Sequence, residues 1–209
     1  MLISKDTPLN EILRLGAPCN RCGKCCEHGS GFVLEHEVKE IAKYLGITEE
    51  ELIKNYLEET ELFNKRVFKL KRVKRENEKT PEIPHGKCVF YDEEKGCLIH
   101  SVKPLFCKIV NCKPYSSEVI QWYFLNFILD TEDPEAVRQW ATYLKYNEPI
   151  VGANLSELIP KDKLDKIMNF ELISKVQVEA EKLKEELNSL ITRSQSSIIF
   201  DKNQNGGAK

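Results

Sequence analysis

Four cysteines lie within eight residues near the N-terminus, in the segment Cys19-Asn20-Arg21-Cys22-Gly23-Lys24-Cys25-Cys26. Thiolates this close repel one another, by about 4 kcal/mol for a pair separated by about 4 Å at an effective dielectric constant of about 20. A bound metal ion reverses that sign, because the thiolate is the form that ligates and the metal supplies the positive charge. The segment therefore predicts a metal site.

The remaining cysteines lie in a second stretch, at Cys88, Cys97, Cys107 and Cys112. The chain has 8 cysteines in 209 residues, and all of them fall between residues 19 and 112. Eight thiols can fill two four-sulfur sites, or one such site with several further thiols in supporting positions. We therefore predict a metal site built from both stretches, with all eight cysteines as candidate ligands.

The spacing of the first stretch favours iron over zinc. Cys19, Cys22 and Cys25 recur every third residue, as ligands of cubane iron–sulfur clusters do, whereas zinc ribbons use two separated Cys-x-x-Cys pairs. A cluster of the 4Fe-4S type is thus the preferred cofactor, and zinc is the alternative. Cys25 and Cys26 can serve one metal atom only if the backbone bends sharply, because successive side chains diverge. Which of the two ligates stays open.

Three histidines lie near cysteines in the sequence, at His28, His85 and His100, and each has a side chain that can ligate zinc. A hydrogen-bonding role at the surface or beside a ligand is the more common one for such residues. The predicted ligand set therefore consists of cysteines alone.

Reduced thiols fit the compartment that the sequence indicates. The first eight residues contain an acid and a proline where a secretory signal has a basic patch and an apolar run. The longest apolar stretch, Val119 to Leu129, is too short to span a membrane. We expect a cytoplasmic protein, in which clustered thiols bind metal rather than form disulfides. Disulfides are the alternative, since the Lys- and Glu-rich composition is typical of thermophiles, but adjacent cysteines such as Cys25 and Cys26 are poorly placed for a bridge.

The charge pattern constrains the partner. The formal net charge of −2 gives no overall bias towards nucleic acid or anionic membranes. The segment 65–79 is rich in Lys and Arg, including Lys69, Lys71, Lys74 and Arg75, but it has little aromatic interleaving, and a solvated strand face explains its charges better. The expected partner is another protein, and nucleic acid is less favoured.

Apolar periodicity predicts an α+β fold that is mostly α. The cysteine-rich part is expected to hold a metal-binding core, a pair of helices and a short β-hairpin with Cys88 and Cys97 at its ends. The helices are predicted at Leu9–Leu15, at Val33–Leu45 with Gly46 as its cap, and from Thr48, which forms a capping box with Glu51, to Glu58. A strand is predicted at Phe63–Arg75.

The part beyond Pro114 has no cysteine and is predicted to be helical. Val119–Leu129 is strand or buried helix, and further helices are expected from Pro134, at Leu155–Ile159, at Lys161–Phe170 and at Ser174–Ile191. We expect a cysteine-cluster domain at 1–117, a helical extension packed on it at 118–193, and a flexible tail at 194–209.

These residues resemble the YkgJ-type cysteine-cluster family, whose domain is described as chelating zinc or iron. The family signature is similar to Cys19–Cys26, to Cys88-Val89-Phe90, and to the run from Cys97 through Pro104 to Cys107, with Cys112 as the last position. His100 stands where the family usually has tyrosine, and Lys103 where it usually has arginine. The resemblance covers residues 19–112 and implies metal chelation.

Three functions remain after this comparison. The first is a protein with one or two iron–sulfur clusters, acting in electron transfer or as an accessory or maturation factor for another enzyme. The second is a structural zinc module for protein or RNA interaction. The third is a protein-lysine N-methyltransferase-like enzyme, which the resemblance implies through one relative, the flagellin lysine N-methylase. The chain lacks Gly-x-Gly-x-x-Gly after a strand, so the third is the minority hypothesis. No catalytic residue is identified, and whether the protein is an enzyme stays open.

Overall fold

The computed structural model describes residues 2–17, 22–27, 31–73, 86–110 and 115–174, together with residues 182–184 and 187. Cys19, Cys112, His28 and His85 lie outside the described residues, as do the predicted tail and most of the predicted helix at 174–191. The described part combines many helices with a few short strands, which confirms the predicted fold class.

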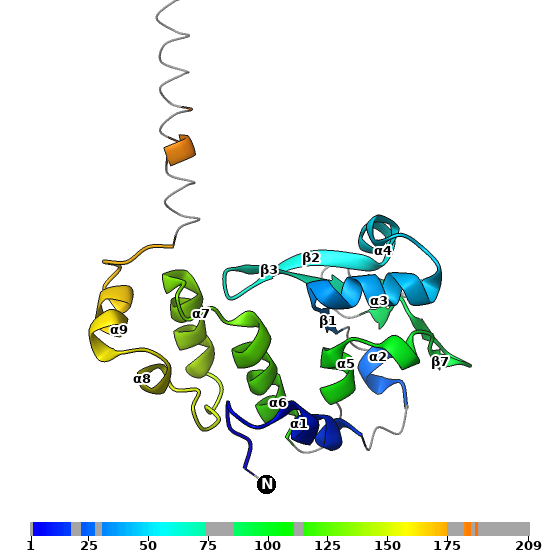
Figure 1. Cartoon of the computed structure of the whole chain (residues 1–209), viewed down its shortest axis with the longest axis horizontal. Coiled ribbons are helices and arrows are strands. Elements are labelled where there is room, and N and C mark those ends of the chain that lie inside the picture. Colours follow the sequence, from blue (N-terminus) through cyan, green and yellow to red (C-terminus); the bar gives the residue numbers. More distant parts are fainter. Residues whose placement is uncertain are drawn as a thin grey trace, which may run out of the picture.

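The cysteine-bearing part begins with two short helices and continues as mixed helix and strand (Figure 1). Its elements are α1 (Leu9–Gly16), α2 (Lys24–Glu27), β1 (Phe32–Val33), α3 (Glu35–Leu45), α4 (Glu49–Tyr56), β2 (Leu57–Leu62), β3 (Lys65–Leu70), β4 (Arg72–Val73), β5 (Lys87–Cys88), β6 (Tyr91–Asp92), β7 (Gly96–Cys97), the 3-10 turn η1 (His100–Val102) and α5 (Leu105–Ile109).

The predicted pair of helices is confirmed by α3 and α4. Gly46 has a φ of 70° and ends α3 in the left-handed conformation. At the start of α4, the backbone N–H of Glu51 donates to Thr48 Oγ1 at 3.1 Å, and the Thr48 N–H donates to Glu51 Oε2 at 2.9 Å. Both helices are shorter than predicted, because residues 32–33 belong to β1 and residue 57 already begins β2.

An antiparallel sheet in the order β1-β3-β2 follows these helices. Strands β2 and β3 form a hairpin, and its turn residues Phe63 and Asn64 have φ values of 50° and 55°. The prediction of one strand over 63–75 is therefore wrong at its start, and it is also broken after Leu70, where β4 leaves to pair with β5.

The sequence does not predict β2, because its three glutamates are residues that strands normally disfavour. Two of these acids lie close to basic side chains of β3 and β4. Glu59 pairs with Arg66, and Glu58 Oε1 lies 3.8 Å from an Arg72 nitrogen. Pairing between opposite charges on neighbouring strands offsets the low strand propensity of glutamate.

The predicted hairpin is confirmed around its turn, but Cys88 does not belong to it. Cys88 lies on β5 and faces Arg72 of β4, whereas Cys97 lies on β7 and faces Tyr91 of β6. The chain turns between β5 and β6, where the Phe90 side chain is buried and stacks on Tyr56 with 5.1 Å between ring centres. The hairpin consists of β6 and β7.

The described structure beyond residue 114 is helical up to Met168. Its elements are α6 (Ser116–Tyr123), the π-helical turn η2 (Phe124–Ile128), α7 (Pro134–Leu144), α8 (Leu155–Leu158) and α9 (Lys161–Met168). The run 119–129 is therefore helix rather than strand. Asp133 caps α7, with its carboxylate accepting from Glu135 N at 2.8 Å, and Pro134 occupies the first turn as predicted. None of the helices in the described part is both long and apolar enough to cross a bilayer.

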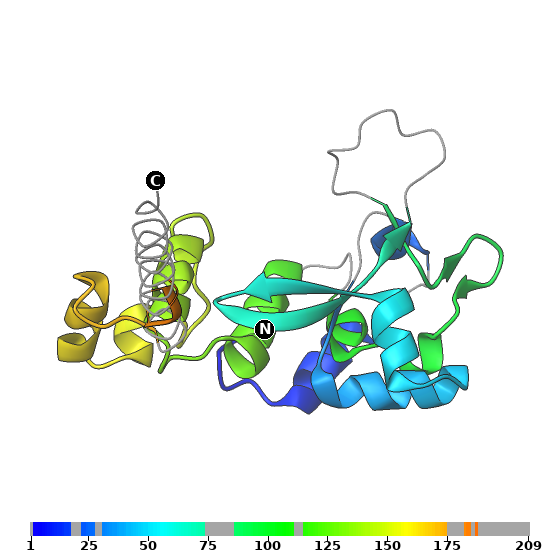
Figure 2. The same ribbon diagram turned by 90° about the horizontal axis from the view of Figure 1, so that it is seen from above.

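Two main hydrophobic clusters hold these elements together, and the β2–β3 hairpin lies between α3 and α4 on one side and the C-terminal helices on the other (Figures 1 and 2). The first cluster is rich in aromatic rings and draws residues from both sides of residue 117, among them Ile12, Phe63, Trp122, Tyr123 and Trp140. The second cluster contains residues of α3, α4 and β3 and four of the cysteines. The cysteines are thus part of a packed core.

Candidate metal centre

Five of the described cysteines gather at the second hydrophobic cluster. Cys88 belongs to its buried core, and Cys26, Cys97 and Cys107 pack against it. Cys25 joins them through Cys26, because the two Sγ atoms are 3.9 Å apart. We call these five residues the thiol cluster. Cys22 is exposed and lies outside it.

Helix α2 carries Cys25 and Cys26, and Tyr91 of β6 fixes its position. The Tyr91 hydroxyl donates to Glu27 Oε1 at 3.2 Å, at the last residue of the helix. At the other end, Gly23 lies so close to the Tyr91 ring that an added Cβ would overlap it. Because β6 pairs with β7, the same tyrosine also brings α2 next to Cys97.

Helix α5 carries Cys107, and Glu37 of α3 fixes its position. The buried Glu37 carboxylate accepts from Leu105 N at 2.6 Å with one oxygen and from Leu34 N at 2.9 Å with the other. It therefore caps α3 and α5 at once, since these are backbone N–H groups at two helix starts. The Cys107 sulfur lies directly against Gly31, where an added Cβ would overlap the sulfur atom.

Burial determines the electrostatics of the inner thiols. It raises the pKa of Cys88 to about 11, and the neighbouring Cys97 and Cys25 add to that rise. Burial also raises the pKa of Cys97 and of Cys107, and in both cases the negative charge of Cys25 contributes. These inner thiols hold their protons unless a positive charge enters the cluster.

The pKa values of Cys25 and Cys26, the two thiols on α2, are shifted in opposite directions. The hydrogen bond from Cys26 lowers the pKa of Cys25 to about 6, and the same hydrogen bond raises the pKa of Cys26. Lys103 also lowers the pKa of Cys25, of Cys97 and of Cys107 through its charge. Within the thiol cluster, Cys25 is thus the thiol that ionises most readily, and Lys103 is a cation beside it.

The described residues fit a metal ion in their chemistry, although they do not yet surround one. Five thiols provide the soft ligands that zinc and iron prefer. In the described part of the chain, no three Cys, His, Asp or Glu side chains converge as a ready coordination sphere. Cys19 and Cys112 lie outside that part, and His100 lies on η1, beyond β7.

Three residues around the cluster are not predicted from the sequence: Gly31, Glu37 and Tyr91. The sequence does contain a signal for Glu37, because a glutamate at the third helix position commonly accepts from the backbone N–H of the N-cap residue, here Leu34. Gly31 and Tyr91 act through contacts with residues more than 60 positions away, for which a single sequence gives no signal.

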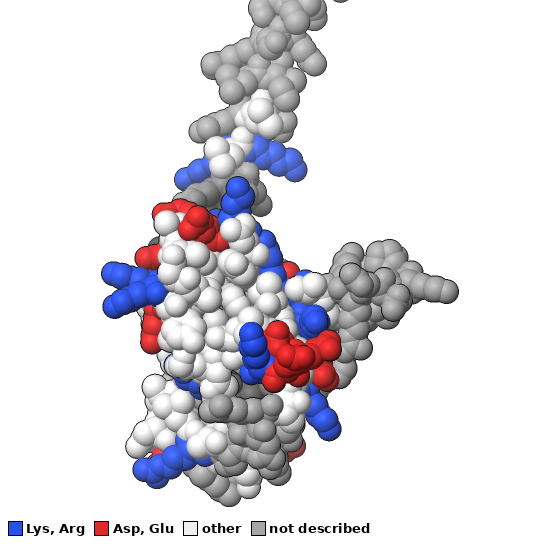
Figure 3. Space-filling view, turned by 90° about the vertical axis from the view of Figure 1, so that its right-hand side faces the viewer, with Lys and Arg blue, Asp and Glu red and all other residues white. Residues whose placement is uncertain are grey.

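Figure 3 shows the end of the molecule towards α2, α3, α4 and β7. Among the described residues, acidic and basic side chains gather towards the margins of this face, and a broad area between them is uncharged. The described part of this face is therefore mostly uncharged.

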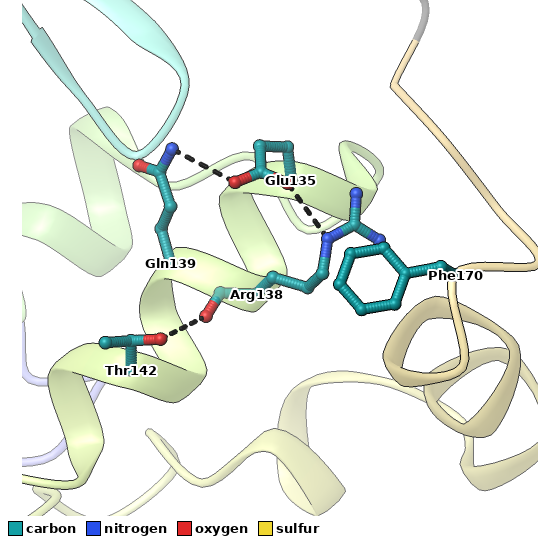
Figure 4. Close-up of a pocket in the computed structure, with 5 residues that line it drawn as sticks. All are labelled: Glu135, Arg138, Gln139, Thr142 and Phe170. Carbon is teal, nitrogen blue, oxygen red and sulfur yellow. Dashed lines mark hydrogen bonds and ion pairs between the residues drawn. The ribbon is translucent and has the colours of Figure 1, made fainter. Parts of the chain in front are cut away.

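A hollow of about 300 Å³ lies far from the cysteines, on α7 and beside the chain that follows α9 (Figure 4). Arg138 pairs with Glu135 at 2.9 Å and lies over the Phe170 ring at 4.6 Å from its centre. Its guanidinium also donates to the Ile167 carbonyl at 2.9 Å. These contacts hold α7 and α9 together, and none of the predicted site residues lies there.

Comparison with known proteins agrees with the cysteine pattern. The model of a family with the signature CxxCxxCC, described as a "putative zinc- or iron-chelating domain", matches residues 18–126. No curated protein and no solved structure matches the chain significantly.

Proposed function

Because the chain belongs to the CxxCxxCC family of zinc- or iron-chelating domains, we propose that its thiol cluster binds a single metal ion, zinc or iron, with sulfur ligands in a tetrahedral arrangement. Metal binding follows from the family. The number of ions and the identity of the ligands are the proposed part.

The distance between Cys25 Sγ and Cys26 Sγ carries this proposal. Two sulfurs bound to one tetrahedral ion, each about 2.3 Å from it, lie about 3.8 Å apart. The observed separation of 3.9 Å fits that geometry with little movement. In a cubane cluster each iron takes a separate cysteine, so the sulfurs are held further apart by the cluster core. Both adjacent cysteines therefore suit one ion.

Cys88, Cys97 and Cys107 supply the other ligands in this proposal. Their sulfurs belong to the same packed cluster, and the raised pKa values of these thiols indicate that they need a cation to ionise. A bound ion would join α2 to β5, β7 and α5, as structural zinc does in other small domains. A tetrahedral ion takes four ligands, and Cys25 and Cys26 provide two of them. Only two of these three cysteines can therefore ligate the ion, and the third is expected to lie beside the site without binding the metal.

An iron–sulfur cluster is the second candidate, and the spacing of Cys19, Cys22 and Cys25 favours it. In that case the protein would act in electron transfer or in maturation of another enzyme.

Under either metal we propose a protein as the partner, supported by the mostly uncharged face at the end of the molecule that carries α2. A methyltransferase-like activity stays an alternative, and calorimetry with S-adenosylmethionine tests it.

Metal analysis and a visible spectrum of anaerobically purified protein test the proposal. We expect one equivalent of zinc or iron per chain and no acid-labile sulfide. The variants Cys25→Ser and Cys26→Ser should each weaken metal binding, whereas Cys22→Ser, at an exposed position outside the thiol cluster, should not. A brown protein with stoichiometric sulfide and a strong effect of Cys22→Ser would support the cluster instead. Protein that binds neither metal would contradict both.

A further inference from the structure

The helix that carries Cys25 and Cys26 has no core contacts of its own. Helix α2 has four residues, and none of them is buried. Its backbone bonds are local, since the N–H groups of Cys26 and Glu27 both donate to the Gly23 carbonyl, at 2.7 and 2.9 Å. Helices shorter than about 12 residues are marginally stable on their own. The position of α2 must therefore come from its contacts with the rest of the molecule.

The other members of the thiol cluster are anchored by the core. Cys88 is itself buried, Cys107 shares α5 with the buried Ile109, and Cys97 is followed two residues later by Ile99, which is fully buried. Segments with few buried side chains open more readily than packed ones. Among the elements that carry the thiol cluster, α2 is thus the one whose position depends on contacts at the surface.

Tyr91 supplies such a contact along the length of α2. Its hydroxyl donates to Glu27 Oε1 at 3.2 Å, at the last residue of the helix. The hydroxyl end of the same ring lies against Gly23, the residue before the helix, and leaves no room there for a Cβ. Because Gly23 and Glu27 are four positions apart, they lie on the same side of the helix. Tyr91 therefore covers that side.

The same tyrosine has a defined position relative to Cys97. The two residues are directly paired in the antiparallel hairpin of β6 and β7. Side chains of directly opposite residues in antiparallel strands lie on the same face. Since the Tyr91 ring lies against α2, the Cys97 side chain is on the side of the hairpin that faces α2. Tyr91 thus sets where α2 lies relative to Cys97.

We propose that Tyr91 is a positioning residue of the metal site, which holds Cys25 and Cys26 beside Cys97 in the metal-free protein. This inference rests on the proposed function, because it concerns the ligands named there. Ligands that are ordered in advance lose less conformational entropy on binding, so metal affinity depends on Tyr91 although it is not a ligand. Loss of its partly buried hydrogen bond should lower the affinity about 3- to 10-fold.

Cobalt(II) titration of the full chain, followed by the thiolate charge-transfer absorption, measures this affinity. Tyr91→Phe keeps the ring and removes only the hydroxyl, and we expect binding about 3- to 10-fold weaker. In a Glu27→Ala background, Tyr91→Phe should have no further effect, because the acceptor is already gone. Glu27→Gln keeps an acceptor oxygen and should retain most of the affinity. Tyr44→Phe, which removes a hydroxyl from a half-exposed side chain on α3, should leave the affinity unchanged.

A second measurement uses metal-free protein. Cys26 is half-buried against the second hydrophobic cluster, so a pulse of iodoacetamide, mapped by mass spectrometry, reports how often α2 moves away. We expect faster alkylation of Cys26 in Tyr91→Phe than in wild type at equal pH, and no change in Tyr44→Phe.

Equal cobalt affinity of Tyr91→Phe and wild type would overturn this inference and leave the proposed function intact. So would an equally large effect of Tyr91→Phe in the Glu27→Ala background, because the hydroxyl would then act through another group. Unchanged alkylation of Cys26 would also contradict it, since α2 would be held without the hydroxyl. Wild-type protein that shows no thiolate-to-cobalt band would overturn both the inference and the proposed function.

Discussion

The sulfur of Cys107 has little room to move, because a glycine backbone closes one side of it. Gly31 precedes β1, and a methyl group added there would overlap the Cys107 Sγ atom. A ligand sulfur held in this way keeps its position before the metal arrives, which reduces the cost of ordering it on binding.

Gly31→Ala should therefore displace Cys107 and weaken metal binding by about 10-fold or more, with a loss of about 1–3 kcal/mol in unfolding free energy from overpacking. Competition with a chromophoric chelator and urea unfolding give the two quantities. Gly46→Ala is the control, because it has open space but a φ of 70°. It should cost about 1 kcal/mol of stability and leave metal affinity unchanged. Equal metal affinities of Gly31→Ala and wild type would show that the contact does not position the sulfur.

Single residues differ in how well a sequence predicts their role. Thiols close together in the chain repel one another wherever they lie, so Cys25 and Cys26 can be assigned as ligand candidates without a structure. Gly31 and Tyr91 cannot, because each matters through a contact with a residue distant in sequence.

At the scale of elements, the carboxylate of Glu37 joins α3 to α5. One side chain satisfies backbone N–H groups at the starts of two helices, and it does so while 7 % exposed. The position of the helix that carries Cys107 is therefore fixed by the helix that packs on the second hydrophobic cluster.

Glu37→Gln keeps one acceptor oxygen and turns an NH₂ group towards the other backbone N–H. We expect a loss of about 1–3 kcal/mol in unfolding free energy and a fall in metal affinity, because a buried donor loses its partner. The control is Glu51→Gln, which alters the analogous capping contact to Thr48 N at 2.9 Å on the exposed start of α4. Its loss should be about 0.5 kcal/mol, with no change in metal affinity. Equal losses in the two variants would argue against the double role of Glu37.

Elements with local stop and start signals are predicted well by the sequence. Thr48 with Glu51, Gly46 and Pro134 each mark a helix end through interactions within a few residues. Strand β2 is not predicted, because its glutamates pair with Arg66 of β3 and Arg72 of β4, which lie elsewhere in the chain. The pairing of β5 with β4 is not predicted either, because it joins residues that are distant in the sequence.

At the scale of the whole molecule, the two main hydrophobic clusters differ in their residues. The aromatic cluster contains both tryptophans, Trp122 and Trp140, and none of the described cysteines belongs to it. The second cluster holds the thiols and would gain a cross-link from a bound ion. Metal should therefore stabilise one end of the molecule more than the other.

Removal of the metal by a chelator should expose the thiols to a disulfide reagent while tryptophan fluorescence stays that of a folded core. Rebinding should restore up to about 4 kcal/mol of stability when free metal exceeds its dissociation constant about 1,000-fold. Thiol reactivity and fluorescence, followed together during chelation, check this. If the fluorescence of the folded core is lost as the thiols become reactive, the aromatic cluster is not stable without the metal. If thiol reactivity does not change on chelation, the thiols do not bind the metal.

X-ray absorption at the metal edge tests most directly whether sulfurs from both stretches of the chain meet at one ion. The account predicts about four sulfur neighbours at about 2.3 Å and no metal–metal scattering. A coordination shell without sulfur would contradict the site itself, and a short iron–iron vector would contradict the single ion.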